Sequence, residues 1–219
     1  MSITHPLLSQ HQLLSEQVEE DELSTILYEL EGVLKLGLNG DVCEFGCFIG
    51  TTSLFLQRIL ITFNSESNSE TKPKKKLYLY DSFDGLPKKT TQDQSAAGVD
   101  FIQGELYASK SQLKLNFKKA NLPVPKIKKA WFSELKSKDL PKEICFAFLD
   151  GDFYSSIWDS LKLIKNSVVE SGIIIIDDYE NPALPGTKTA VSEFLQANKN
   201  FKLGKITHSL AILKKGLAD

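Results

Sequence analysis

Two runs of consecutive apolar residues constrain the fold of this chain more strongly than any other feature of its sequence. In "EICFAFLDGD" the run ends in Asp150 and Asp152, and in "GIIIIDDY" it ends in Asp177 and Asp178. Short continuous apolar runs are typical of strands that are buried on both faces, as in a parallel sheet covered by helices. Ligands of such sheets bind beyond the carboxyl ends of the strands, so we expect the four acids to line a common crevice.

The rest of the chain alternates between strand-like and helix-like segments. The predicted strands cover 41–45, 77–83, 126–132, 143–150 and 172–179, and the predicted helices cover 23–34, 51–63, 111–120, 155–168 and 187–198. Two further segments, 201–206 and 210–215, are expected to close the chain as an antiparallel hairpin. This order predicts an α/β fold with a mostly parallel sheet and helices on both faces.

Length and charge limit the domain count and the partners. The 219 residues fit one domain, which we place at 23–219, after a polar and irregular segment, 1–22, that is expected to be a flexible arm. The 26 Lys and Arg residues nearly balance the 28 Asp and Glu residues, which argues against nucleic acid or a membrane as a partner. Because no signal peptide is visible and no run reaches the roughly 18 apolar residues of a membrane helix, we expect a cytoplasmic protein. A homo-oligomer is possible.

A glycine-containing turn follows the first predicted strand. "VCEFGCFIG" places Glu44 at the strand end and Gly46 and Gly50 in the turn before a helix, where backbone can approach a ligand closely. The next strand ends at Asp81, which is placed either to accept hydrogen bonds from ribose hydroxyls or to cap a turn. The spacing is G-x-x-x-G and not the G-x-G-x-x-G of dinucleotide-binding proteins, so the turn alone is a weak signal.

The acids that follow the two apolar strands suit a hard divalent cation. Mg²⁺ takes oxygen ligands and keeps several waters, so carboxylates from two neighbouring strand ends would serve it. The alternative is that these acids are solvated caps of strand ends. For Asp152 three roles are open: contact with the substrate, orientation of Asp150, or a cap before Ser155. We favour a supporting role.

Five motifs occur in one order along the chain: "DVCEFGCFIGTTS", "YDSFDGLP", "FLDGDFYSS", "IIIIDDY" and "LPGTKTAVSEF". Together they resemble the TylF-type, or macrocin O-methyltransferase-like, family of class I S-adenosylmethionine-dependent methyltransferases, over about residues 38–197. The resemblance implies a Rossmann-like, seven-stranded sheet in which the C-terminal strand is antiparallel. Many members carry a Trp-Arg-Gly-like turn where this chain has Phe48, Ile49 and Gly50, so a role for that arginine is absent here.

The resemblance also implies which residues surround the cofactor. Glu44, Gly46 and Gly50 would shape its pocket, and Thr52 and Ser53 would lie near its amino-acid end. Asp81 would hold its ribose, with Ser82 and Phe83 alongside, and Phe132 and Ser133 would lie near its adenine. In the same way it makes Asp150, Asp177 and Asp178 the Mg²⁺ ligands, and it suggests Asp150 as the catalytic acceptor of the substrate hydroxyl proton.

The leading hypothesis is therefore a Mg²⁺-dependent O-methyltransferase that uses S-adenosylmethionine and acts on a hydroxyl of a small molecule. A sugar or glycoside of secondary metabolism is the first acceptor expected, with contacts from the arm, from 88–110 as a lid, and from 180–186. One alternative is an NAD-linked oxidoreductase or epimerase, which would need G-x-G-x-x-G and usually a Tyr-x-x-x-Lys pair. The other is a non-catalytic module that binds S-adenosylmethionine without turnover.

Overall fold

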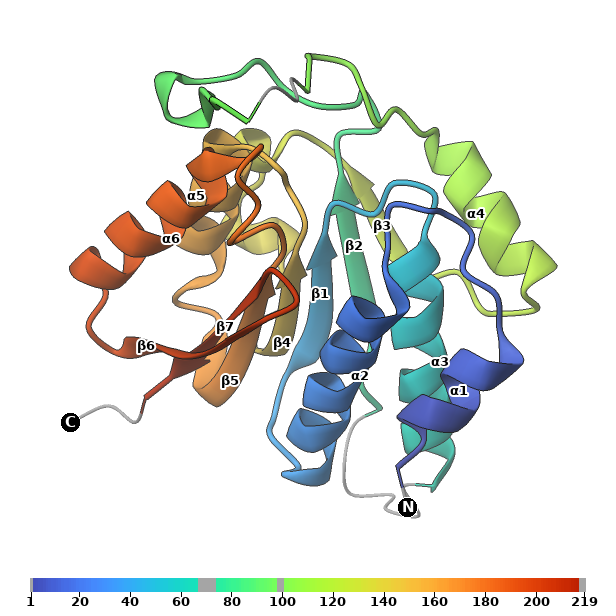
Figure 1. Ribbon diagram of the computed structural model, residues 1–219. Coiled ribbons are helices and arrows are strands. Elements are labelled where there is room, and N and C mark those ends of the chain that lie inside the picture. Colours follow the sequence, from blue (N-terminus) through green and yellow to red (C-terminus); the bar gives the residue numbers. More distant parts are fainter. Residues whose placement is uncertain (1, 67–73, 98–100, 217–219) are drawn as a thin grey trace.

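The computed structural model describes residues 2–66, 74–97 and 101–216. Its centre is a seven-stranded sheet in the order β3-β2-β1-β4-β5-β7-β6 (Figure 1). The strands are β1 (Asp41–Phe45), β2 (Leu77–Asp81), β3 (Lys126–Lys129), β4 (Ile144–Leu149), β5 (Val168–Ile176), β6 (Phe201–Thr207) and β7 (Leu210–Lys215). Neighbouring strands from β3 to β5 pair in parallel, whereas β7 is antiparallel to both β5 and β6. The class I methyltransferase sheet with its reversed C-terminal strand is therefore confirmed.

Helices cover both faces of the sheet, because successive residues of the buried strands point to opposite sides. On one face, Val42, Phe146 and Phe148 pack in one core with α2 (Glu20–Lys35), α3 (Thr51–Glu66) and α4 (Lys110–Lys119). On the other face, Phe45 and Leu149 pack in a second core with α5 (Tyr154–Ile164) and α6 (Pro185–Ala197). Figure 1 shows these two helical layers on either side of the strands. No helix within the described residues is long and apolar enough to cross a membrane.

The register of the central strands places their exits in one row. Phe45 of β1 lies opposite both Tyr80 of β2 and Leu149 of β4, and Leu149 lies opposite Ile176 of β5. The next residue of each strand therefore meets its neighbours at the same edge. The backbone N–H groups of Gly46, Asp150 and Asp177 donate to the carbonyls of Tyr80, Phe45 and Leu149 at 2.9, 2.8 and 2.9 Å, which continues the ladder one residue beyond the strands.

Several element boundaries differ from the sequence-based ones. The predicted helix 155–168 ends at Ile164, because Val168 already pairs with Ile144 at the start of β5. The predicted strands 77–83 and 126–132 are shorter, since the chain turns after Asp81 and enters a 3-10 turn at Phe132–Glu134. Two further 3-10 turns span Thr91–Asp93 and Ser137–Asp139.

The N-terminal segment contains a helix where the sequence predicts an irregular arm. Helix α1 (Thr4–Gln10) is attached to α2 through the buried carboxylate of Glu31, which accepts hydrogen bonds from Ser2 Oγ at 2.7 Å and Thr4 Oγ1 at 2.9 Å. The apolar side chains of Leu7 and Leu8 pack against the first core. These contacts explain why the segment takes regular structure, while the flexibility of 1–22 and the assignment of 23–219 as one domain stay predictions.

Candidate functional site

A cavity of about 660 Å³ lies at the carboxyl ends of the strands. Its lining includes the residue that directly follows each of four neighbouring strands: Gly46 after β1, Ser82 after β2, Asp150 after β4 and Asp177 after β5. The shared register of these strands explains why residues far apart in the chain meet here. The common crevice predicted for the strand-end acids is therefore present.

The turn after β1 is held by the acid at the end of β2. Oδ2 of Asp81 accepts hydrogen bonds from the backbone N–H groups of Cys47 at 2.7 Å and Phe48 at 3.1 Å, and Oδ1 accepts one from Phe83 at 2.6 Å. Burial raises the pKa of the Asp81 carboxyl above its ordinary value, while these backbone donors act in the opposite direction. Asp81 still lines the cavity, so it both fixes the turn and faces the space beside it.

The same turn brings backbone from β1 and β4 into direct contact. A Cβ atom at Gly46, whose φ is 89°, would overlap the carbonyl oxygen of Asp150, so only glycine fits. Left-handed backbone recurs around the cavity at Phe48, Asp152 and Asp178, with φ of 44°, 58° and 56°. Such conformations are uncommon for residues other than glycine and mark positions where the surrounding structure fixes the chain.

Glu44 lies behind the cavity wall. Its side chain is buried and accepts a hydrogen bond of 2.5 Å from Ser53 Oγ in the first turn of α3. Burial raises the pKa of the Glu44 carboxyl to about 8, against the opposing effect of the Ser53 hydrogen bond. The neighbouring hydroxyl of Thr51 is buried without a hydrogen-bond partner among the described residues.

The residues predicted to surround the cofactor therefore divide into two groups. Gly46, Asp81, Ser82, Phe132 and Ser133 line the cavity. Five others do not appear in its lining and lie behind it, in the strand, turn or helix that supports the wall: Glu44, Gly50, Thr52, Ser53 and Phe83. Sequence position alone did not separate the two groups, because both occur in the same short motifs.

Three carboxylates form a compact cluster at the other side of the cavity. One oxygen each of Asp150, Asp152 and Asp178 lies within 4.8 Å of the others. Asp177 lines the same cavity, but its Oδ1 accepts a hydrogen bond of 2.9 Å from the backbone N–H of Asp178. Asp152 thus joins the cluster with its carboxylate, while its backbone carbonyl accepts from Thr187 Oγ1 at 2.9 Å.

Burial raises the pKa of all four carboxyls in this group, and repulsion from neighbouring carboxylates raises it further for Asp150, Asp152 and Asp177. For Asp150 the burial effect is followed by repulsion from Asp177 and Asp152, and for Asp177 by repulsion from Asp178 and Glu22. Burial and the neighbouring Asp178 raise the pKa of Asp152 to about 7. Such an arrangement is costly without a cation, since like charges at this separation disfavour ionisation.

The cluster fits a hard divalent cation by its donor chemistry. All of its side-chain donors are carboxylate oxygens, which Mg²⁺ prefers. Among the cavity-lining residues that the structure describes there is no lysine, arginine or histidine to neutralise them. The alternative that these acids are solvated caps of strand ends does not explain why three carboxylates converge.

The segment 88–110, which is predicted to be a lid, contributes to one wall of the cavity. Its residues 98–100 are not among the residues that the structure describes. It is held by the buried carboxylate of Asp93, which accepts hydrogen bonds from the backbone N–H groups of Thr90 at 2.8 Å and Tyr154 at 2.6 Å. A Cβ atom at Gly186 in α6 would overlap the same carboxylate. Phe101 and Leu106 pack on a small core beneath and line the cavity.

Another part of the lining comes from the N-terminal segment, in which the sequence analysis did not name any single contact residue. Glu16, Gln17, Glu19 and Glu22, at and before the start of α2, all line the cavity. The only available signal was the acidic stretch "EQVEEDE", residues 16–22. Its polar pattern has no periodicity that would place it against the strand exits.

Comparison with known proteins identifies related sequences. Residues 17–210 match the family model described as Macrocin-O-methyltransferase (TylF). The chain is 26% identical over 178 residues to an 8-demethyl-8-(2,3-dimethoxy-alpha-L-rhamnosyl)-tetracenomycin-C 4'-O-methyltransferase of Streptomyces olivaceus, covering 78% of this chain and 64% of that protein. It is also 26% identical over 179 residues to a mycinamicin III 3''-O-methyltransferase of Micromonospora griseorubida, covering 78% and 66%. The match thus spans just under two thirds of the length of these relatives.

A solved structure supports the fold assignment. The O-methyltransferase NovP superposes with a TM-score of 0.75 at 22% sequence identity, covering 91% of this chain and 81% of that one. At this identity the likeness concerns the fold alone.

Proposed function

The chain belongs to the Macrocin-O-methyltransferase (TylF) family, and on that premise we propose that it transfers the methyl group of S-adenosylmethionine to a hydroxyl of a small molecule. The observation that carries the proposal is that one cavity of about 660 Å³ joins the glycine-containing turn after β1 to the carboxylate cluster at the ends of β4 and β5. The first side offers backbone and an acid for a nucleoside, and the second offers oxygen ligands for a cation.

We assign the cofactor to the side formed by the exits of β1 and β2. S-adenosylmethionine supplies an activated methyl group on its sulfonium. Asp81 lines the cavity and would accept hydrogen bonds from ribose hydroxyls. Phe132, packed edge-on against Phe45 at 5.4 Å between ring centroids, also lines the cavity and would offer an apolar surface to the adenine.

We assign a divalent cation, with Mg²⁺ as first choice, to Asp150 and Asp178, together with Asp152 or Asp177. A bound cation would lower the pKa of the acceptor hydroxyl and orient it. Asp150 is the proposed proton acceptor, as the sequence suggests. Because the carboxylate of Asp152 lies in the same cluster, it is a second candidate for this role.

The acceptor is proposed to be a sugar or glycoside of secondary metabolism. Two relatives are named for methylation of a glycosylated tetracenomycin and of mycinamicin III. In this chain, Phe101 and Leu106 line the cavity and would contact the apolar part of such an acceptor.

The test is calorimetric titration with S-adenosylmethionine and with NAD, each with and without Mg²⁺, followed by methyl-transfer assays on a panel of glycosides. We expect binding of S-adenosylmethionine only, and transfer that requires a divalent cation. Binding of NAD in its place would establish the oxidoreductase alternative. Tight binding of S-adenosylmethionine without transfer to any hydroxyl acceptor, at any metal concentration, would support the non-catalytic module.

A further inference from the structure

The lining of the cavity is far more acidic than the proposed cofactor and cation require. Ten of the described lining residues are Asp or Glu, and no described lining residue is Lys, Arg or His. The whole chain, in contrast, carries a net charge of only −2. S-adenosylmethionine carries one net positive charge and a divalent cation two. These charges would neutralise most of the inner carboxylates, at the exits of β2, β4 and β5, whereas the described lining offers no cationic side chain to the outer ones.

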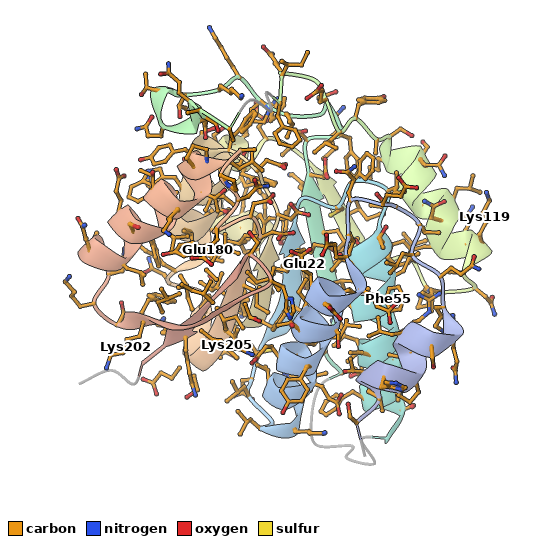
Figure 2. All side chains as sticks on the ribbon, viewed as in Figure 1. Glu22, Phe55, Lys119, Glu180, Lys202 and Lys205 are labelled. Atoms are coloured by element: carbon orange, nitrogen blue, oxygen red, sulfur yellow. The ribbon has the colours of Figure 1, made fainter. Side chains whose placement is uncertain are left out.

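The outer carboxylates come from three separate elements that converge on the mouth of the cavity. Glu16, Glu19 and Glu22 lie at and before the start of α2, Asp159 lies on α5, and Glu180 follows β5. Figure 2 shows Glu22 near the carboxyl-terminal end of β1 and Glu180 on the side of α5 and α6. Convergence from elements so far apart in the chain is not explained by one acidic helix face.

Glu22 is the most enclosed of these groups. Its side chain is half-buried, and it faces Glu19 and Asp178, so it stands between the rim and the carboxylate cluster. Lys188 lies 3.8 Å from Glu180, but both side chains are exposed, and an exposed pair of this kind contributes little. A partly buried carboxylate of this kind is stabilised by a cation that enters with the ligand.

Another part of the lining is apolar. Leu86, Phe101, Leu106 and Leu184 belong to a small apolar core and also line the cavity. A ligand that fills the cavity therefore meets hydrocarbon as well as carboxylates.

We infer that the acceptor is an amphipathic, amine-bearing glycoside, whose protonated amine is bound by Glu22 with Glu19 and whose apolar body lies against Leu86, Phe101 and Leu106. The inference rests on the proposed function, because it names the acceptor of that same cavity. The same lining disfavours sugar nucleotides, since a diphosphate would meet only carboxylates where recognition of phosphate calls for Arg or Lys. It equally disfavours uronic acids.

The experiment compares three probes that share a 6-deoxyhexose with free hydroxyls: its phenyl glycoside, the phenyl glycoside of the corresponding amino-dideoxyhexose, and its nucleoside diphosphate. Binding of each probe is measured calorimetrically with S-adenosylhomocysteine and Mg²⁺ present, and methyl transfer is measured separately. We expect the amine probe to bind roughly tenfold or more tightly than the neutral one, with this advantage falling as NaCl is raised. We expect the nucleotide to bind most weakly.

The variant Glu22→Gln should lower the affinity for the amine probe about tenfold and change the affinity for the neutral probe by no more than about twofold. Glu20→Gln is the matched control, because Glu20 is exposed on the same helix and is not part of the lining. Equal or weaker binding of the amine probe than of the neutral one, preference for the nucleotide, or an equal effect of both variants would overturn the inference. An amine probe that binds as expected but accepts no methyl group would instead contradict the proposed function.

Discussion

Oδ2 of Asp81 lies 2.7 Å from the backbone nitrogen of Cys47, so the acid that ends β2 holds the turn that follows β1. Asp81→Ala would leave three buried or half-buried N–H groups without their acceptor. We expect a loss of about 1.5–3 kcal/mol in stability, and weaker S-adenosylmethionine binding because the turn no longer has its shape. Calorimetric melting and cofactor titration check both effects.

Asp84→Ala is the control for this change, since the Asp84 side chain forms an exposed salt bridge with Lys129 and does not contact the turn after β1 among the described residues. Such pairs contribute about 0–1 kcal/mol. If Asp81→Ala melted like the wild type while the cofactor bound poorly, the residue would act on the ribose alone, and its role in holding the turn would be disproved.

Substitution of the clustered acids should change the metal requirement. Asp150→Asn and Asp178→Asn should each raise the Mg²⁺ concentration needed for methyl transfer, and EDTA should inhibit the wild type reversibly. Asp150→Asn is expected to be the more severe, because loss of a general base typically costs about 10²–10⁴-fold in rate. The measurement is transfer rate against Mg²⁺ concentration.

Two comparisons sharpen the metal prediction. Asp152→Asn and Asp177→Asn measured side by side would show which carboxylate completes the site, and Asp159→Asn, outside the cluster but in the same cavity, should leave the Mg²⁺ dependence unchanged. An EDTA-insensitive wild type would eliminate the metal assignment.

Glu44 should make stability depend on pH in a defined direction. Its pKa is about 8 in the folded protein and 4.5 ordinarily, so the folded state keeps a proton that the unfolded chain releases. The stability associated with this proton is complete below about pH 4.5 and is lost as pH rises through 8. Glu44→Gln, which cannot ionise, should therefore gain in melting temperature over the wild type between pH 5 and pH 9, by at least about 2–4 °C. A constant difference across this range would show that Glu44 ionises normally.

Loosening the wall formed by the 88–110 segment should affect the acceptor and spare the cofactor. In Gly186→Ala the new methyl group would displace the Asp93 carboxylate, which holds this segment to the first turn of α5. We expect a higher KM for the acceptor, by about tenfold for a lost charged hydrogen bond, with the Kd of S-adenosylmethionine within about twofold. Gly204→Ala is the control, because its Cβ would meet no atom closer than 3.6 Å. A variant that weakens cofactor and acceptor equally would contradict an acceptor-side role.

The sequence was sufficient for the sheet and for the edge at which the site forms. Continuous apolar runs such as "CFAFL" and "IIII" are typical of strands buried on both faces, and the acids after such strands share one edge of the sheet. Which acids converge could not be read, because it depends on the left-handed backbone of Asp152 and Asp178. Nor could the use of Asp81 by the turn after β1, which requires the register of β1 against β2.

The row of strand exits that runs from Asp81 through Gly46 and Asp150 to Asp177 also bears on how the protein matures during translation. The two central strands, β1 and β4, are separated by about a hundred residues of chain, and β5 follows only at Val168–Ile176. A ribosome must therefore synthesise most of the polypeptide before the cavity is complete, and until then the edge of β1 that pairs with β4 has no partner. Premature termination before β5 would yield a chain with unpaired, apolar strand edges, which would make it prone to aggregation.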